Sequence, residues 1–253
     1  MMPACHEFVD WDFFWRRVEK HPLFLKLLYR VHLRYYKKIL LPISLNNPKM
    51  LELGAGTGQA SIYIKQIYGG NLTLIDNNPF AYKMHRKLFK DVPEINYITK
   101  DFFDVGAQPI YDLVISDGLL EHFSDKMNLV LLHKSFAKTN GYILIFALGD
   151  NLLSRFLALG EKKMGYSQPI NLGHCIKLCE KCGLEMVHTH IVEPFCRVLR
   201  PPAIYRVFLA AQTTIGFNAV CLVHNCSTTC ARALEIVNVA KSFFEYGILC
   251  MKK

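Results

Sequence analysis

The segment LELGAGTG at residues 51–58 decides the fold of this 253-residue chain. It is a short apolar run followed by three glycines at alternate positions, and residues 59–68 after it have the pattern of a helix. Glycines let a ligand approach the backbone where a Cβ would clash, and the helix N-terminus offers free N–H groups. The segment therefore predicts a ligand-binding turn between a strand and a helix.

The spacing of the glycines argues against the usual dinucleotide-binding turn. The motif is G-x-G-x-G, not G-x-G-x-x-G, and the acidic residue Glu52 precedes its first glycine by two positions. A carboxylate there would repel a pyrophosphate and attract a ligand that carries a cationic amine. The expected ligand therefore carries a cationic amine.

Short apolar runs and helical patterns alternate on both sides of this turn, which predicts an α/β fold with a doubly wound, Rossmann-like and mostly parallel sheet of seven strands. The expected strands are residues 50–53, 71–75, 95–98, 111–116, 142–148, 184–191 and 245–251. The expected helices between them are residues 59–68, 79–90, 126–137 and 171–182.

Two segments lie outside this alternation. Residues 1–44 are expected to form a helical leader or lid, divided at Pro22, and residues 45–253 a single domain. Within that domain, residues 193–242 are too long for a plain connection and are expected to be a helical insertion, with helices at 203–211 and 229–242. The leader is basic and aromatic, and the insertion is apolar with little charge.

Four motifs occur in the order that a known family shows. They are ELGAGTG at 52–58, Ile75-Asp76, Lys100-Asp101-Phe102, and YDLVIS at 111–116 followed by Leu120-Glu121-His122. With these motifs the sequence resembles the class I S-adenosylmethionine-dependent methyltransferases, from residue 49 to about residue 192. The resemblance implies an enzyme that uses S-adenosylmethionine, and it does not identify the methyl acceptor.

The resemblance also implies which residues hold the cofactor. The glycine loop would surround the aminoacyl part of the cofactor, and Glu52 would bind its amine. Asp76 would bind the ribose, and Asp101 with Phe102 would bind the adenine. The expected cofactor-binding residues are Glu52, Gly54, Ala55, Gly56, Gly58, Asp76, Asn77, Asp101, Phe102 and Ser116.

The candidates for a general base follow the fourth expected strand. Methyl transfer mainly needs alignment and, for hydroxyl acceptors, a base. The candidates are Asp117, Glu121 and His122, of which Asp117 and His122 are selected. His122 stands in a triplet that the family shows whatever its substrate. The sequence SDGL at 116–119 replaces an Asn-Pro-Pro-Tyr signature, which disfavours methylation of DNA bases or glutamine amides.

The cysteines give no metal site. Cys175, Cys179 and Cys182 recur at i, i+4 and i+7, as expected for the buried face of a helix. A tetrahedral zinc site would need further ligands such as His224, Cys226 or Cys230. Core packing is the preferred interpretation, and the odd number of nine cysteines fits a reducing, cytoplasmic setting.

The net charge of +9 is uneven along the chain. Residues 41–150 carry ten basic and eleven acidic side chains, whereas residues 151–253 carry twelve and six. The expected acceptor is a small, apolar or lipid-like molecule methylated on O, N or C, with peripheral membrane contact as a possible partner interaction. One alternative is a protein or RNA acceptor that docks on the basic flanks. A second alternative is a non-catalytic cofactor-binding protein, which the intact acidic residues disfavour.

Overall fold

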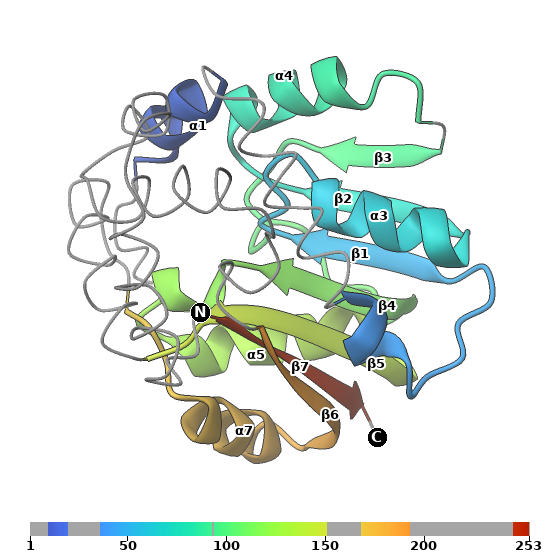
Figure 1. Ribbon diagram of the computed structural model, residues 1–253, viewed down its shortest axis with the longest axis vertical. Helices are drawn as coiled ribbons and strands as arrows, with labels where there is room; N and C mark the ends of the chain where they lie inside the picture. The colour runs from blue at the N-terminus through green and yellow to red at the C-terminus, as the bar shows by residue number, and fades with distance from the viewer. Residues whose placement is uncertain (1–9, 20–35, 93, 151–167, 193–244, 253) are drawn as a thin grey trace, which may run out of the picture.

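The computed structural model describes residues 10–19, 36–92, 94–150, 168–192 and 245–252, and the structural statements below concern these residues (Figure 1). The expected insertion at 193–242, with its two helices, and the break at Pro22 lie outside them. The division into a leader and a domain stays a prediction.

Seven strands form one sheet in the order β3-β2-β1-β4-β5-β7-β6 (Figure 1). All neighbours are parallel except β7, which runs antiparallel to both β5 and β6. This confirms the predicted doubly wound, mostly parallel sheet. The strands are β1 (Lys49–Leu53), β2 (Asn71–Ile75), β3 (Ile95–Ile98), β4 (Tyr111–Asp117), β5 (Ala137–Leu148), β6 (Leu184–Val192) and β7 (Glu245–Lys252).

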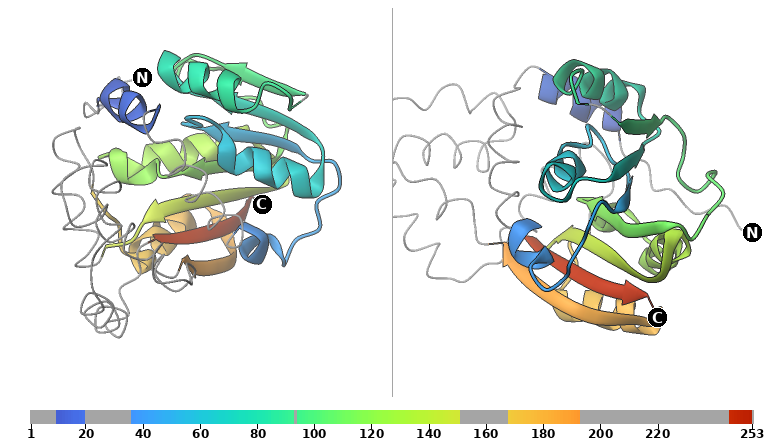
Figure 2. Two further views of the ribbon diagram at one scale, coloured as in Figure 1. Left: turned by 45° about the horizontal axis from the view of Figure 1, so that its top comes forward. Right: turned by 90° about the vertical axis from the view of Figure 1, so that its right-hand side faces the viewer.

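Helices cover both faces of the sheet (Figure 2). α5 and α7 lie on one face, and α3 with the helical residues 36–40 lies on the other. None of the described helices is both long and apolar enough to cross a bilayer. The helices are α1 (Trp11–Glu19), α3 (Gln59–Tyr68), α4 (Pro79–Leu88), α5 (Lys126–Phe136) and α7 (Leu172–Lys181), with a 3-10 turn, η1, at Leu120–His122.

Strand β1 shows how the sequence pattern becomes a two-sided core. Leu51 and Leu53 pack into the cluster beneath α5 and α7, whereas Met50 packs into the cluster beneath α3. Successive side chains of a strand point to opposite faces, so a continuous apolar run buries both faces of a covered strand. The same alternation turns Glu52 to the α3 side, away from Leu51 and Leu53.

The predicted start of the fifth strand is wrong. The expected fifth strand began at Tyr142, whereas β5 begins at Ala137. Tyr111 pairs with Ala137 and Leu113 with Tyr142, so residues 138–141 form a bulge within the strand. Asn140 has a φ of 59° there, which explains why its turn-like sequence was read as a break.

The packing of the cysteines on α7 is confirmed. Cys175, Cys179 and Cys182 are buried, together with Cys250 from β7. Among the described residues, no group of three or more His, Cys, Asp or Glu side chains is placed to hold a metal ion. His224, Cys226 and Cys230 lie outside those residues.

A buried histidine on α5 predicts acid sensitivity. His133 is fully buried, its Nδ1 lies 2.7 Å from the Leu129 carbonyl oxygen, and its Nε2 has no hydrogen-bond partner among the described residues. Burial lowers the pKa of His133 to about 4. As the pH falls from 8 to 5, His133 therefore takes up a proton in the unfolded chain but stays neutral in the folded protein. This residue alone should lower the free energy of unfolding by about 2 kcal/mol over that range.

Urea unfolding followed across that pH range checks this expectation. His133→Leu should flatten the loss of stability between pH 8 and pH 5, because leucine takes up no proton. His174→Leu is the matched control, since His174 is exposed on α7 and its replacement should leave the profile unchanged. Equal pH dependence in the wild type and in His133→Leu would contradict the assignment.

Candidate functional site

The glycine loop after β1 lies at the carboxyl edge of the parallel strands, on the left in Figure 1. Its glycines have positive φ angles, 53° at Gly56 and 71° at Gly58, which other residues rarely adopt. The Gly56 N–H donates to Asp76 Oδ2 at 2.7 Å, and the Gly56 carbonyl accepts from the Tyr97 hydroxyl at 2.6 Å. The loop is thus held from β2 and β3 before any ligand arrives.

Protein packing also requires these glycines. A Cβ on Gly56 would lie 2.4 Å from Cζ2 of Trp15, and a Cβ on Gly58 would lie 2.2 Å from Cδ1 of Leu74. From the sequence, these positions were expected to need glycine because a ligand approaches the backbone closely. In the structure, the α1 side chain Trp15 already occupies the contact at Gly56.

Asp76 organises the turn after β2. Its two carboxylate oxygens accept from the backbone N–H groups of Gly56 (2.7 Å) and Asn78 (2.8 Å). Burial raises the pKa of Asp76, and these two hydrogen bonds oppose the rise. A carboxylate has about four acceptor positions, so Asp76 can also accept hydroxyl groups of a ligand. Asn77, the other predicted residue of this turn, is exposed.

Glu52 is a buried acid at the end of β1. Its side chain is 2% exposed, and Oε2 has no hydrogen-bond partner among the described residues. Burial raises the pKa of Glu52 well above its usual range; hydrogen bonding with Ser61 opposes this, and the nearby charges of Asp117 and Asp76 add to the rise. A cationic ligand group beside Glu52 would supply the missing counter-charge.

Asp101 and Phe102, the residues predicted to bind adenine, lie on the loop after β3. Asp101 Oδ1 accepts from the Phe103 N–H at 2.9 Å, which fixes the carboxylate in a tight turn. Phe102 is buried in the core cluster, with its ring 4.9 Å from Phe103 and 5.9 Å from Phe123 between centroids. Phe102 therefore shapes the floor of this region, with little of its ring open to solvent.

The acceptor-side candidates lie at the end of β4. Asp117 accepts a hydrogen bond from the hydroxyl of Tyr36, which is fully buried and meets Phe146 edge-on at 4.6 Å. The neighbouring Ser116 is fully buried, and its Oγ has no partner among the described residues. His122, on η1, packs edge-on against Trp11 at 4.9 Å. Asp117 and His122 are thus held by different parts of the leader.

Sequence reasoning missed the side chains that hold this region in place. Trp15 and Tyr36 come from the leader. Asn78 lies in the turn before α4, His85 on α4 and Tyr97 on β3. His85 Nδ1 lies 3.0 Å from the Thr57 carbonyl oxygen, beside the Tyr97 contact to Gly56. The aromatic content of the leader was the available signal, but no spacing in the sequence links it to the glycine loop.

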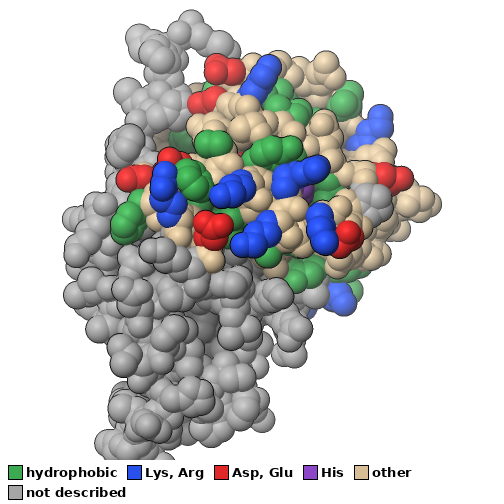
Figure 3. All heavy atoms as spheres, turned by 90° about the horizontal axis from the view of Figure 1, so that it is seen from above, with side chains coloured by type: hydrophobic (Ala, Val, Ile, Leu, Met, Phe, Trp, Pro, Cys, Tyr) green, Lys and Arg blue, Asp and Glu red, His purple; other side chains and the backbone are tan. Residues whose placement is uncertain are grey.

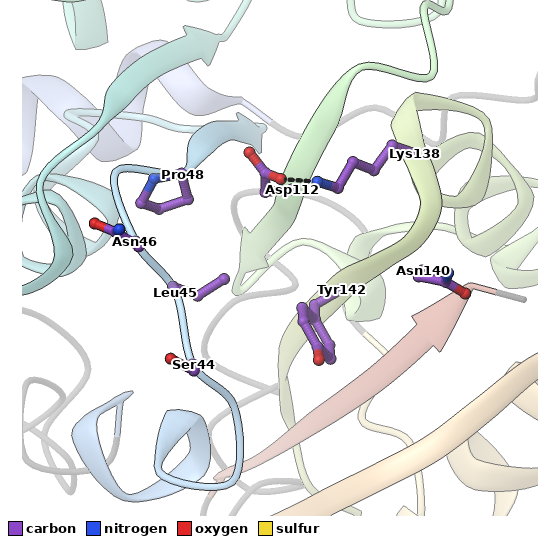
Figure 4. Close-up of a pocket in the computed structure, with 8 residues that line it drawn as sticks. All are labelled: Ser44, Leu45, Asn46, Pro48, Asp112, Lys138, Asn140 and Tyr142. Atoms are coloured by element: carbon purple, nitrogen blue, oxygen red, sulfur yellow. Dashed lines mark ion pairs between the residues drawn. The ribbon is translucent and has the colours of Figure 1, made fainter.

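A separate cavity of about 130 Å³ lies at the opposite edge of the sheet (Figure 4). An ion pair between Asp112 and Lys138 borders it, and Asp112 also accepts from the Lys49 N–H at 2.7 Å. These residues lie at the amino ends of β1, β4 and β5, so this cavity is not part of the candidate site. It is lined by Ser44, Leu45, Asn46, Pro48, Asp112, Lys138, Asn140 and Tyr142.

Comparisons with known proteins agree with this geometry. Residues 50–138 match a family model described as a methyltransferase domain. The malonyl-(acyl-carrier protein) O-methyltransferase 1 of Ilyobacter polytropus is 27% identical over 123 residues, which are 47% of this chain and 46% of that protein. The chain thus matches less than half the length of this curated relative.

Two solved structures share the fold at low sequence identity. Geranyl diphosphate C-methyltransferase from Streptomyces coelicolor A3(2), in complex with Mg²⁺, geranyl diphosphate and S-adenosylhomocysteine, has a TM-score of 0.63 and 8% identity over 89% of this chain and 81% of that one. A chain from the complex of the Haloferax volcanii Trm112 methyltransferase activator with a methyltransferase has a TM-score of 0.68 and 12% identity, with 96% and 95% covered. These likenesses confirm the predicted fold.

Proposed function

Since this chain carries a class I S-adenosylmethionine-dependent methyltransferase domain, matched by the family model at residues 50–138, we propose that it transfers a methyl group from S-adenosylmethionine to a small molecule. The observation that carries the proposal is the convergence of Glu52, Asp76 and Asp117. Glu52 lies at the end of β1, Asp76 directly after β2 and Asp117 at the end of β4, and these three strands are adjacent. The charges of both aspartates act on Glu52. Such an acidic edge suits a ligand with cationic groups and ribose hydroxyls.

When bound, the cofactor supplies a methyl group on a positively charged sulfur, which is already an excellent leaving group. The protein then has to align donor and acceptor and, for a hydroxyl acceptor, remove a proton. In our proposal Glu52 holds the amine, Asp76 the ribose and Asp101 the adenine. Asp117, oriented by Tyr36, and His122, packed on Trp11, are the two groups available as a base.

We propose a small, apolar or lipid-like acceptor. The sequence of residues 193–242 supports this, because it is apolar, carries little charge and follows the acceptor side of the fold. The proteins named above act, by their names, on malonyl-(acyl-carrier protein) and on geranyl diphosphate, one on oxygen and one on carbon. Their difference leaves the methylated atom of this chain's acceptor as O, N or C.

Binding and turnover test the proposal separately. Calorimetry of the full chain should show binding of S-adenosylhomocysteine, and the absence of binding would contradict the cofactor assignment. Incubation of the protein with methyl-labelled S-adenosylmethionine and a lipid extract should then move label into the organic phase. Label recovered only in the protein or RNA fraction would reject the small-molecule acceptor in favour of the alternative below.

Cofactor binding should release a proton from Glu52. In the free protein the raised pKa of Glu52 favours its protonated form, whereas an ammonium group placed beside it favours the ionised form. Affinity for S-adenosylhomocysteine should therefore increase as the pH rises through that pKa. Calorimetry over a series of pH values, in two buffers with different ionisation enthalpies, measures the proton count, and Glu52→Gln should abolish the release. An unchanged proton count in Glu52→Gln would place the amine elsewhere.

A basic face supports the alternative of an anionic macromolecular acceptor. Figure 3 shows Lys and Arg side chains gathered on the side of the molecule where α4 lies. Lys83, Arg86, Lys87 and Lys90 are exposed on or just after α4, which contains no acidic residue. Among these four, only Lys87 has an ion pair with a described residue, Glu19 at 3.9 Å.

Salt dependence separates this alternative from the small-molecule proposal. If RNA is the acceptor, its binding should weaken steeply as salt rises, and the variant Lys83→Gln/Arg86→Gln should reduce the slope of that dependence by about two. The control Lys177→Gln/Lys181→Gln removes two exposed lysines from α7, at the other end of the sheet. RNA binding that ignores salt, or responds equally to both variants, would reject a docking role for α4.

A further inference from the structure

Helix α1 reaches the cofactor-binding turn through one hydrogen bond. The side-chain N–H of Asn78 donates to Asp12 Oδ1 at 2.6 Å, across 66 positions of the chain. Asn78 is 7% exposed, whereas Asp12 lies on the exposed side of α1. The contact therefore joins a surface side chain of the leader to a buried residue of the turn after β2.

The remaining polar atoms of Asn78 hold the rest of that turn. Its backbone N–H donates to Asp76 Oδ1 at 2.8 Å, and its Oδ1 caps α4 by accepting from the Ala81 N–H at 3.0 Å. Asn78 therefore links α1, through its side chain, to the Asp76 carboxylate, through its backbone N–H.

A second contact of α1 closes a ring of interactions. Asp76 Oδ2 accepts from the Gly56 N–H at 2.7 Å, and the Trp15 indole lies against the Cα of Gly56. The chain of contacts thus runs from Asp12 through Asn78, Asp76 and Gly56 to Trp15, and so returns to α1. Leader, ribose carboxylate and glycine loop form one connected unit.

Two further contacts between α1 and α4 lie outside this ring. Arg16 sits over the Phe80 ring at 4.2 Å, and the partly buried Glu19 reaches the exposed Lys87 at 3.9 Å. Asp12 and Glu19 are therefore two acids on the same helix, both reaching the α4 region, of which only Asp12 touches the cofactor turn.

We propose that Asp12 and Asn78 are positioning residues for the ribose end of the cofactor, so that docking of α1 and binding of the adenosine part stabilise each other. The inference rests on the cofactor site proposed above. If docked α1 fixes the position of Asn78, and Asn78 fixes that of Asp76, then loss of the Asp12 contact lowers the affinity of the protein for the ribose part of the ligand. No group that touches the ligand is removed. Thermodynamic linkage requires the reverse effect as well: the bound ligand must hold α1 in place.

The test compares two ligands with three variants of Asp12 and Glu19. The ligands are S-adenosylhomocysteine and 5′-methylthioadenosine. Both ligands contain adenine and ribose, and only S-adenosylhomocysteine also contains the amino acid part. Asp12→Ala should weaken both ligands about fivefold to tenfold, which is less than the loss of a direct hydrogen bond between a charged group and the ligand, because Asp12 acts through Asn78. Asp12→Asn keeps an acceptor oxygen and should stay within about twofold of the wild type. Glu19→Ala should leave both affinities unchanged.

A variant of the partner residue makes the test independent of Asp12. Asn78→Ser keeps a capping oxygen for α4 and the backbone N–H to Asp76, but it loses the amide N–H that reaches Asp12. It should lower affinity as much as Asp12→Ala does, and the double variant should be no weaker than either single variant. Additive losses would show that the two residues act separately and would overturn the proposal.

Fluorescence reports the position of α1 directly. Trp15 and Trp11 are the two tryptophans of the whole sequence, and both lie on α1. Emission of the free Asp12→Ala variant should shift to longer wavelength than that of the wild type and return toward it when ligand binds. Failure of the wild type to bind S-adenosylhomocysteine would reject the proposed function itself. Wild-type binding with an unaltered Asp12→Ala variant, or a loss confined to S-adenosylhomocysteine, would overturn this inference alone.

Discussion

Replacement of Asp76 by alanine is expected to weaken binding of S-adenosylhomocysteine by one to two orders of magnitude. In the proposed site, the change removes hydrogen bonds between this carboxylate and the ribose hydroxyls, which are worth about 1.5–3 kcal/mol. It also removes the acceptor that holds the Gly56 N–H at 2.7 Å, so the glycine loop loses one of its anchors. Both effects act in the same direction.

Calorimetry on the wild type, Asp76→Ala and a control variant measures this loss. Asp91→Ala is a suitable control because Asp91 is an exposed acid beyond the end of α4, away from the turn after β2. Asp76→Asn should be intermediate, since an amide oxygen keeps one acceptor. Unchanged affinity in Asp76→Ala would place the ribose elsewhere.

Replacement of Gly58 by alanine is expected to lower the free energy of unfolding by about 3 kcal/mol. The residue has a φ of 71°, which costs an L-residue roughly 1–2 kcal/mol. Its new Cβ would lie 2.2 Å from Cδ1 of Leu74, and Leu74 is fully buried and cannot swing into solvent. Overpacking of this kind costs roughly 1–3 kcal/mol more.

Gly106 offers a matched control within the same chain. A Cβ there would meet no atom within 4 Å, so Gly106→Ala should be neutral or slightly stabilising. Urea unfolding of the two variants beside the wild type gives both values. If Gly58→Ala lowers the free energy of unfolding by less than about 1 kcal/mol, Leu74 can repack around the new Cβ. Close approach of a ligand would then be the main reason for a glycine at this position.

The periodic segments of the fold were predictable from the sequence. Buried parallel strands require continuous apolar runs, and strands such as residues 71–75 and 95–98 were placed with their observed limits. The fifth strand was misplaced at its start because residues 138–141 form a bulge inside the sheet. Turn-forming residues such as Asn140 and Gly141 have the same local signature in a loop and in a bulge.

The candidate site was predictable only where its residues follow strand ends. Glu52, Asp76 and Asp117 come from different strands, but parallel strands bring their carboxyl ends to one edge, so these acids could be grouped from sequence order. Asn77 was selected on the same basis, yet it is exposed, and its neighbour Asn78 makes the buried contacts. A one-residue difference in a turn is decided by backbone direction, which the motif does not encode.

The sequence by itself determined the fold class, through the alternation of strands and helices around the glycine-rich segment at 51–58. It determined the kind of ligand through the order of four motifs, because local backbone freedom and strand order are properties of the chain sequence. The tertiary structure alone decided which groups hold that loop. Trp15 reaches Gly56, Asp12 reaches Asn78, and Tyr36 reaches Asp117 across 81 positions. Such contacts depend on how the leader packs against the sheet, and packing selects partners by shape and distance in space, with no periodicity along the chain to reveal them.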